Sequence, residues 1–171
     1  LSPIKGVETL INSFENLSKK YNFIRLFIVG HKESAYGKKI EKAAKNSPHA
    51  LKIHFTGKVN TVLDYYSIAN IFVLPTIKKG EGCPVSLLEA MSCGITPVAS
   101  NVSGIKDILN PFPELMFSPG DIYRLTEILE SVILDKKDKR SIYRNHILKN
   151  FNIDLEVNGH MKIYKKLLGS N

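Results

Sequence analysis

The residues best suited to chemistry in this sequence are two glutamates that bracket a short apolar stretch. Glu81 stands in a polar loop, and Glu89 follows with seven residues between them, inside a helix predicted over residues 85–93. A rise of 1.5 Å per residue places Glu89 about 6 Å along the axis from the first helical turn. The free N–H groups of such a turn bind phosphate or sugar oxygens. One elongated polar ligand could therefore contact Glu81, the helix amino end and Glu89 together.

The loop that leads into this helix is built for a close approach of the backbone to a ligand. Gly82, Cys83 and Pro84 precede Val85, and Pro is well tolerated in a first helical turn, where its missing N–H costs little. The helix itself is apolar nearly all round, which is typical of a buried helix and leaves Glu89 partly buried and in need of hydrogen-bond donors. The alternative is that both glutamates are ordinary solvent-facing carboxylates.

Apolar runs on both sides of this stretch predict the strands that position it. Residues 71–75 and 95–99 read as buried strands, and together with the helix between them they form a βαβ unit, which places ligands at the carboxyl ends of its strands. The same patterns predict strands over residues 25–29, 53–55 and 115–117. Predicted helices cover residues 7–20, 35–45, 61–69, 121–134, 139–149 and 154–168. The fold class is therefore α/β, a doubly wound parallel sheet with helices at the carboxyl terminus.

Within the predicted helix 61–69, four side chains are expected to face the core: Val62, Leu63, Tyr66 and Ile68. The neighbouring pair Tyr65 and Tyr66 is interpreted as packing, not as a stacking platform for a ligand. Apolar side chains also recur through the last predicted helix, at Met161, Ile163, Tyr164, Leu167 and Leu168.

The wording of the central stretch, Glu-Gly-Cys-Pro-Val-Ser-Leu-Leu-Glu-Ala-Met-Ser-Cys-Gly over residues 81–94, resembles the signature of the retaining glycosyltransferases of family 4, also called group 1. The resemblance extends over about residues 5–134 and is to the donor-binding, carboxyl-terminal domain of the GT-B fold. It implies that the first glutamate, Glu81, contacts the donor sugar and that Glu89 binds the ribose hydroxyls. It also implies that the backbone from Gly82 to Val85 holds sugar and phosphate oxygens.

Two further loops match the same family. The segment Ser-Pro-Ile-Lys-Gly at residues 2–6 resembles its phosphate-binding loop, so Lys5 is expected to clamp the leaving diphosphate at a helix amino end. In the family an arginine just before this loop shares that task, but the sequence starts at Leu1 and has no position for it. Gly57 and Lys58 stand in the loop that the resemblance places against the nucleotide base. For Lys5 the plain alternative is a solvated loop lysine.

Length and these matches lead to an expectation about organisation. At 171 residues the chain is expected to form one nucleotide-sugar-binding domain over residues 1–171. The first strand and the amino-terminal acceptor domain of the family are expected to be missing. The chain alone is therefore expected to be inactive, with the acceptor domain of the same polypeptide as its partner. The family resemblance further implies hexosyl transfer from a nucleoside-diphosphate sugar and no metal or other cofactor, and the spacing of the five histidines suggests no metal site.

Charge raises a competing hypothesis. The formal net charge is +8, which suits nucleic acid or an anionic membrane surface. The lysines are scattered, however, and no basic stripe interleaved with aromatic residues resembles a single-strand binding surface, so nucleic-acid binding is not expected. Peripheral contact with an anionic membrane remains open, with a cytoplasmic location, including the inner membrane face. No apolar run approaches the roughly 20 residues that span a bilayer.

Two other function classes stay in competition with a transferase. A glycoside hydrolase needs two carboxylates roughly 5–9 Å apart on the two sides of one sugar, a task for which Glu89 on an apolar helix is poorly suited. A non-catalytic nucleotide-sugar-binding module would keep Glu89 and the base loop but lose Lys5 or Glu81, and both are present.

Overall fold

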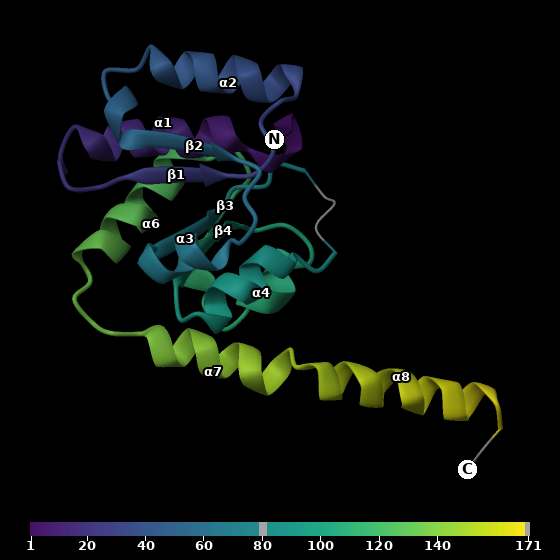
Figure 1. Cartoon of the computed structure of the whole chain (residues 1–171). Helices are drawn as coiled ribbons and strands as arrows, with labels where there is room; N and C mark the ends of the chain where they lie inside the picture. The colour runs from purple at the N-terminus through teal and green to yellow at the C-terminus, as the bar shows by residue number, and fades with distance from the viewer. Residues whose placement is uncertain (79–81, 170–171) are drawn as a thin grey trace.

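Parallel strands form the centre of the molecule, in two separate ladders (Figure 1). The computed structural model describes residues 1–78 and 82–169. In the first ladder β1 (Leu26–Val29) pairs with β2 (Ile53–Gly57). In the second, β4 (Thr96–Ser100) lies between β3 (Ile71–Leu74) and β5 (Met116–Phe117). The α/β class and parallel direction predicted from the sequence are confirmed, and the sheet is divided between β1 and β3.

Helices connect the strands and cover the ladders. The first half of the chain contains η1 (Pro3–Lys5), α1 (Val7–Ser18), α2 (Ala35–Lys45), η2 (Ala50–Lys52) and α3 (Leu63–Ile68). The second half contains α4 (Val85–Ser92), α5 (Ile105–Leu109), η3 (Pro113–Leu115), α6 (Ile122–Leu134), α7 (Arg140–Asn150) and α8 (Ile153–Leu167). Each predicted helix is present, with ends that differ from the prediction by up to two residues.

Each ladder has its own apolar core, and α1 contributes to both. Four side chains of α1 pack with α2, β1 and β2: Val7, Leu10, Ile11 and Phe14. Its last apolar residue, Leu17, belongs to the larger core formed by β3, β4, β5 and the helices α4 to α7. Ile24 and Val73 pack against both cores. One helix and two shared side chains therefore join the ladders into a single unit.

Helix α1 is also joined to α6 by polar contacts. The buried Ser13 hydroxyl accepts a hydrogen bond from Thr126 Oγ1 at 3.0 Å. Lys20, just beyond α1, forms a 3.0 Å ion pair with Glu130 of α6, and the Tyr21 hydroxyl donates to the same carboxylate at 2.9 Å. Burying a polar group is tolerated only when a partner satisfies it, so the Ser13–Thr126 pair fixes how these helices align.

The prediction for the third helix was wrong in part. Helix α3 begins at Leu63 instead of Thr61, and Leu63 and Ile68 are each 63% exposed instead of packed in the core. The two central residues make its ring contacts: Tyr65 lies against Phe27, and Tyr66 lies edge-on to Phe72. The side chains at the two ends of this six-residue helix are thus left in solvent, and its central tyrosines make the packing contacts.

The carboxyl-terminal helices differ in how they attach. Tyr143 and Ile147 anchor α7 in the larger core, and the Arg144 guanidinium donates to the Ser92 carbonyl at the end of α4. Helix α8 continues away from the rest of the molecule (Figure 1), and all of its side chains are exposed.

Candidate functional site

The predicted site residues follow the carboxyl ends of the parallel strands. Gly57 is the last residue of β2, and the loop after β3 leads to Gly82, Cys83 and Pro84 before α4. Lys5 lies beside the end of β3, because its neighbour Gly6 closely approaches the Pro75 carbonyl. Open parallel sheets bind ligands at this edge because the loops that leave the strands can shape themselves around a ligand. The sequence-based prediction of where the site lies is therefore consistent with the fold.

Helix α4 is held rigidly while its amino end stays open. Leu87, Ala90 and Met91 have no exposed surface, so one face of the helix is fixed in the core. Pro84 is buried and occupies the N-cap position, directly before the predicted helix start at Val85; its carbonyl accepts from the Leu87 N–H at 2.9 Å. Val85 is 62% exposed, and the N–H groups of Val85 and Ser86, which precede the Leu87 bond, lack partners within the helix. These groups are available to an anionic ligand.

The Glu89 side chain is exposed, which corrects the expectation of a partly buried carboxylate. It lies on the side of α4 away from the face that carries Leu87 and Met91. Its Oε2 accepts a hydrogen bond from the Tyr66 hydroxyl at 3.2 Å. Glu89 is thus accessible to a ligand and has a fixed protein partner.

A close backbone contact brings the Lys5 loop against the segment that follows β3. Gly6 has φ +63°, and a Cβ added there would lie 1.9 Å from the Pro75 carbonyl oxygen. The Ile77 N–H donates to the Ile4 carbonyl at 2.8 Å. Lys5, which is exposed, therefore lies at the amino end of α1 and beside the loop that leads to α4.

The predicted base loop forms a second part of this edge. Gly57 has φ +73°, and its carbonyl accepts from the Gly30 N–H at 3.1 Å, which joins the ends of β1 and β2. Lys58 is exposed. Nearby, Lys32 pairs with Glu41 at 2.8 Å and its Cε would lie 3.7 Å from a Cβ at position 57. The contacts described for Gly57 join it to the β1 loop, not to Glu89.

Glu81, the predicted sugar contact, lies outside the described residues. Its role stays a prediction from the sequence.

Tyr66 is the residue that sequence reasoning missed. It was assigned to packing, yet its hydroxyl contacts both Glu89 and the Ser86 carbonyl, the latter at 3.3 Å. Burial, followed by the nearby Glu89 charge, raises the pKa of the Tyr66 hydroxyl well above its ordinary value. The one signal available beforehand was general: a buried tyrosine hydroxyl usually finds a hydrogen-bond partner.

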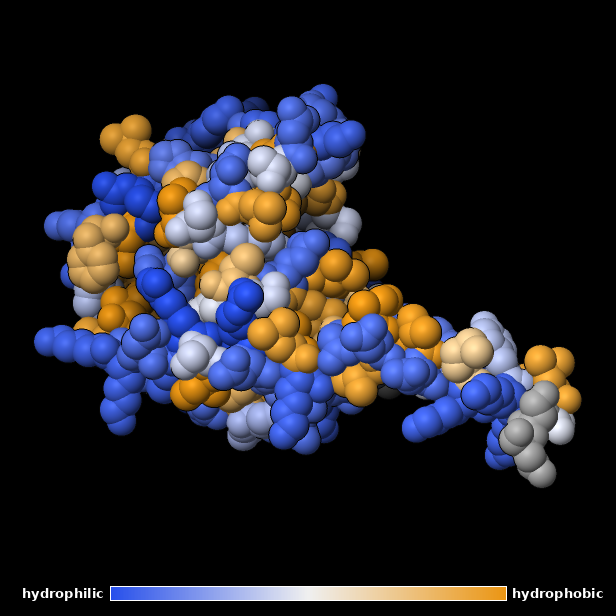
Figure 2. Space-filling view, turned by 60° about the horizontal axis from the view of Figure 1, so that its bottom comes forward, coloured by the Kyte–Doolittle hydropathy of each residue, from blue (hydrophilic) through white to orange (hydrophobic). Residues whose placement is uncertain are grey.

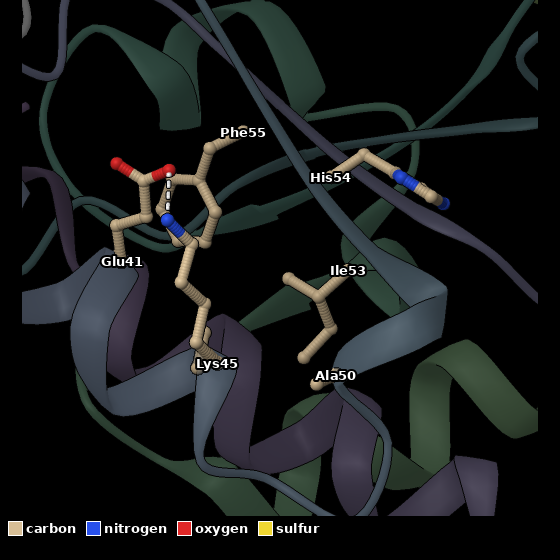
Figure 3. Close-up of a pocket in the computed structure, with 7 residues that line it drawn as sticks. Glu41, Lys45, Ala50, Ile53, His54 and Phe55 are labelled. Atoms are coloured by element: carbon tan, nitrogen blue, oxygen red, sulfur yellow. Dashed lines mark ion pairs between the residues drawn. The ribbon is translucent and has the colours of Figure 1, made fainter.

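Two cavities in the part of the chain that the structure describes lie away from the predicted site residues. One of about 220 Å³ lies between α2 and the start of β2, where Glu41 and Lys45 form a 3.2 Å ion pair beside Ile53 and Phe55 (Figure 3). Another of about 190 Å³ is lined by Thr96, the first residue of β4, and by side chains of α6. Both lie toward the amino ends of strands and are lined by none of the predicted site residues.

Two negative findings apply to the described part of the chain. Over residues 1–78 and 82–169, His, Cys, Asp and Glu side chains form no group of three or more that could hold a metal ion. In the same ranges, no helix is both long enough and apolar enough for a membrane span.

Comparisons with known proteins agree with this description. Residues 1–149 match the family model for glycosyl transferases, group 1. An uncharacterized glycosyltransferase of Methanocaldococcus jannaschii is 30% identical in an alignment of 177 positions, which covers 96% of this chain and 43% of that protein.

Solved structures match the fold. A glycosyltransferase from Rickettsia africae superposes with a TM-score of 0.87 at 18% identity, covering 98% of this chain and 46% of that one. The Anabaena protein HepE, solved with UDP and glucose, has a TM-score of 0.80 at 21% identity over 98% of this chain and 45% of its own. The chain thus spans less than half the length of each of these proteins. The family model covers most of the chain, and the chain accordingly belongs to the group 1 glycosyl transferases.

Proposed function

We propose that this chain is the donor-binding half of a retaining glycosyltransferase that moves a hexose from a nucleoside-diphosphate sugar to an acceptor hydroxyl. One observation carries the proposal: backbone contacts fasten the Lys5 loop to the segment that leads to α4. The amino end of α4 is open, and the same helix presents Glu89. A cation, a helix amino end and an exposed carboxylate at one sheet edge suit a diphosphate joined to a ribose. The HepE structure with UDP and glucose is in keeping with such a donor.

The chemistry that this arrangement supports is stabilisation of a leaving group. As the bond from the anomeric carbon to the diphosphate oxygen breaks, negative charge grows on the diphosphate. The Lys5 ammonium and the first N–H groups of α4 can bind that charge. Glu89 would accept hydrogen bonds from the ribose hydroxyls, and Glu81 would hold the sugar. We propose that the anomeric configuration is retained and that neither a metal nor another cofactor takes part.

We propose that the divided sheet is completed by another strand of a longer polypeptide. The Ser34 hydroxyl, in the segment that follows β1, donates to the Leu1 carbonyl at 2.9 Å, and the Ile4 carbonyl accepts from Ile77 just beyond β3. The segment leading to α1 thus crosses the carboxyl ends of both ladders. A strand running toward these ends between β1 and β3 would be parallel to both, and would lead directly into the Lys5 loop.

We propose that α8 packs against the acceptor-binding half. Four of its apolar side chains, spaced four, four and three residues apart, share one helix face: Ile153, Val157, Met161 and Tyr164. Each is at least 48% exposed, and Figure 2 shows apolar side chains along this projecting helix. Its lysines, among them Lys162, Lys165 and Lys166, would suit contact with an anionic membrane at the inner face, for a cytoplasmic enzyme.

Calorimetric titration of the chain with UDP, GDP and ADP tests the proposal. Saturable binding of one diphosphate is expected, and Glu89→Gln should weaken it by about tenfold, since hydrogen bonds to a charged group contribute about 1.5–3 kcal/mol. Glu127→Gln, at an exposed ion pair on α6, is the matched control and should bind as the wild type does.

Three results would count against the proposal. Unchanged affinity of Glu89→Gln would remove Glu89 from the site. Affinity for mixed-sequence oligonucleotides that falls steeply with salt, without saturable binding of a diphosphate, would favour the nucleic-acid alternative. Robust sugar transfer by this chain alone would refute its being half of the enzyme.

A further inference from the structure

Tyr66 holds one oxygen of the Glu89 carboxylate from a neighbouring element. Its hydroxyl lies 3.2 Å from Glu89 Oε2 and 3.3 Å from the Ser86 carbonyl oxygen, one helical turn earlier on α4. A carboxylate and a carbonyl only accept hydrogen bonds, so the tyrosine proton is the donor to both. The contact joins α3, before β3, to α4, after β3.

The tyrosine ring is itself fixed. It is half-buried and lies edge-on to Phe72 of β3, with ring centroids 6.2 Å apart and planes at 69°. Such edge-to-face pairs have a preferred geometry, which limits rotation of the ring and hence the position of its hydroxyl. Burial keeps the hydroxyl protonated, as the raised pKa of Tyr66 indicates.

Glu89 needs this support because the rest of its side chain is in solvent. The α4 backbone is anchored by Leu87, Ala90 and Met91, but an exposed glutamate side chain still samples many rotamers. Fixing such a side chain when a ligand binds costs affinity. A partner that already holds Oε2 lowers that cost and leaves the other oxygen, Oε1, available to a ligand.

We propose that Tyr66 is a positioning residue: its hydroxyl orients the Glu89 carboxylate toward the vicinal hydroxyl groups of the donor ribose. The inference rests on the proposed function, since it takes Glu89 to be the ribose-binding carboxylate. It adds a residue from α3, which lies outside the sequence signature at residues 81–94. Tyr66 acts through Glu89 and need not touch the ligand.

The experiment compares Tyr66→Phe with Tyr65→Phe, the adjacent tyrosine, whose ring packs on Phe27. Each variant is titrated with whichever of UDP, GDP and ADP the wild-type chain binds, and with the 2′,3′-dideoxy form of that diphosphate. Tyr66→Phe should raise the Kd for the ribose form by about threefold to tenfold, as expected for losing one preordered side chain. Tyr65→Phe should bind as the wild type does.

Two further readouts separate positioning from a general loss of structure. The dideoxy diphosphate should bind to Tyr66→Phe and to the wild type with equal Kd, because it lacks the hydroxyls from which Glu89 would accept hydrogen bonds. Adding Tyr66→Phe to Glu89→Gln should cause less than a twofold further change, because the two residues act as one unit. Thermal melts should show that all variants remain folded.

The outcomes distinguish this inference from the proposed function. If Glu89→Gln weakens binding but Tyr66→Phe does not, the positioning role is refuted and the proposed function stands. An equal loss for the ribose and dideoxy forms would show that Tyr66 only maintains structure, which also refutes positioning. If no diphosphate binds, or if Glu89→Gln has no effect, the ribose assignment fails and this inference fails with it.

Discussion

The Ile77 N–H donates a hydrogen bond to the Ile4 carbonyl at 2.8 Å, and this contact joins two loops that lie more than seventy residues apart in the sequence. The first loop carries Lys5, and the second leads through Gly82 and Cys83 to α4. The sequence pattern of each loop does not indicate that it contacts the other. In the proposed function, their contact would allow one diphosphate to meet a lysine and a helix amino end at the same time.

Replacing Gly6 with alanine should separate these loops. The new Cβ would lie 1.9 Å from the Pro75 carbonyl oxygen, and φ of +63° is unfavourable for any residue with a side chain. We expect a loss of at least about 2 kcal/mol in the free energy of unfolding, measured by urea denaturation. Gly159→Ala is the matched control, because a Cβ there meets nothing within 4 Å on exposed α8. Its helix propensity should keep stability unchanged or improve it. Equal free energies of unfolding for Gly6→Ala and Gly159→Ala would contradict the close contact between Gly6 and the Pro75 carbonyl.

Lys5→Ala should weaken binding of a nucleoside diphosphate more than binding of the matching nucleoside. Lys5 is exposed, so solvent reduces its contribution, and we expect about a fivefold rise in Kd for the diphosphate. The difference should shrink when the salt concentration is raised, because exposed charges are screened. Lys39→Ala, on the exposed side of α2, controls for the loss of one positive charge. An equal effect of both variants would show that Lys5 acts only through net charge.

The Glu130 carboxylate should make the α1–α6 contact sensitive to acid. Hydrogen bonds from Lys20, then from Tyr21, hold the pKa of Glu130 below its usual range in the folded protein. A carboxyl group whose pKa is lower when folded adds stability above its unfolded pKa. That stability is lost as pH falls through the folded value. In urea denaturation from pH 7 to pH 3, Glu130→Gln should show a smaller fall in stability than the wild type. If the free energy of unfolding of Glu130→Gln fell as much as that of the wild type over this pH range, the contribution of Glu130 would be refuted.

Removing α8 should leave the domain folded. Each residue of α8 is exposed, whereas Tyr143 and Ile147 of α7 are 3% and 6% exposed in the larger core. A chain ending at Phe151 should therefore melt within about 2 °C of the full chain. Ile147→Ala should be destabilised by about 2–5 kcal/mol, the usual range for emptying a core position. A large drop in melting temperature on truncation would show that α8 contributes to the fold.

Local patterns in the sequence determined the class of fold and the order of its elements. Continuous apolar runs, and the glycine that ends the helix between them, predicted β3, α4 and β4 closely. This is because strand and helix periodicities are properties of short segments. The Asp121 cap of α6 was equally local, since its carboxylate accepts from the Arg124 N–H three residues on. The signature around Glu89 gave the family, which the match over residues 1–149 confirmed.

The tertiary structure decided which of these segments meet. The exposure of Glu89 depends on how α4 rotates against the core, and apolar residues all round the helix left that rotation open. The partnership of Tyr66 with Glu89 depends on how α3 and α4 pack on the two sides of β3. Leu63 and Ile68 looked like core residues because hydrophobicity records what a side chain favours and not whether a partner covers it. Contacts between residues far apart in the chain are set by packing, and a periodic pattern carries no information about them.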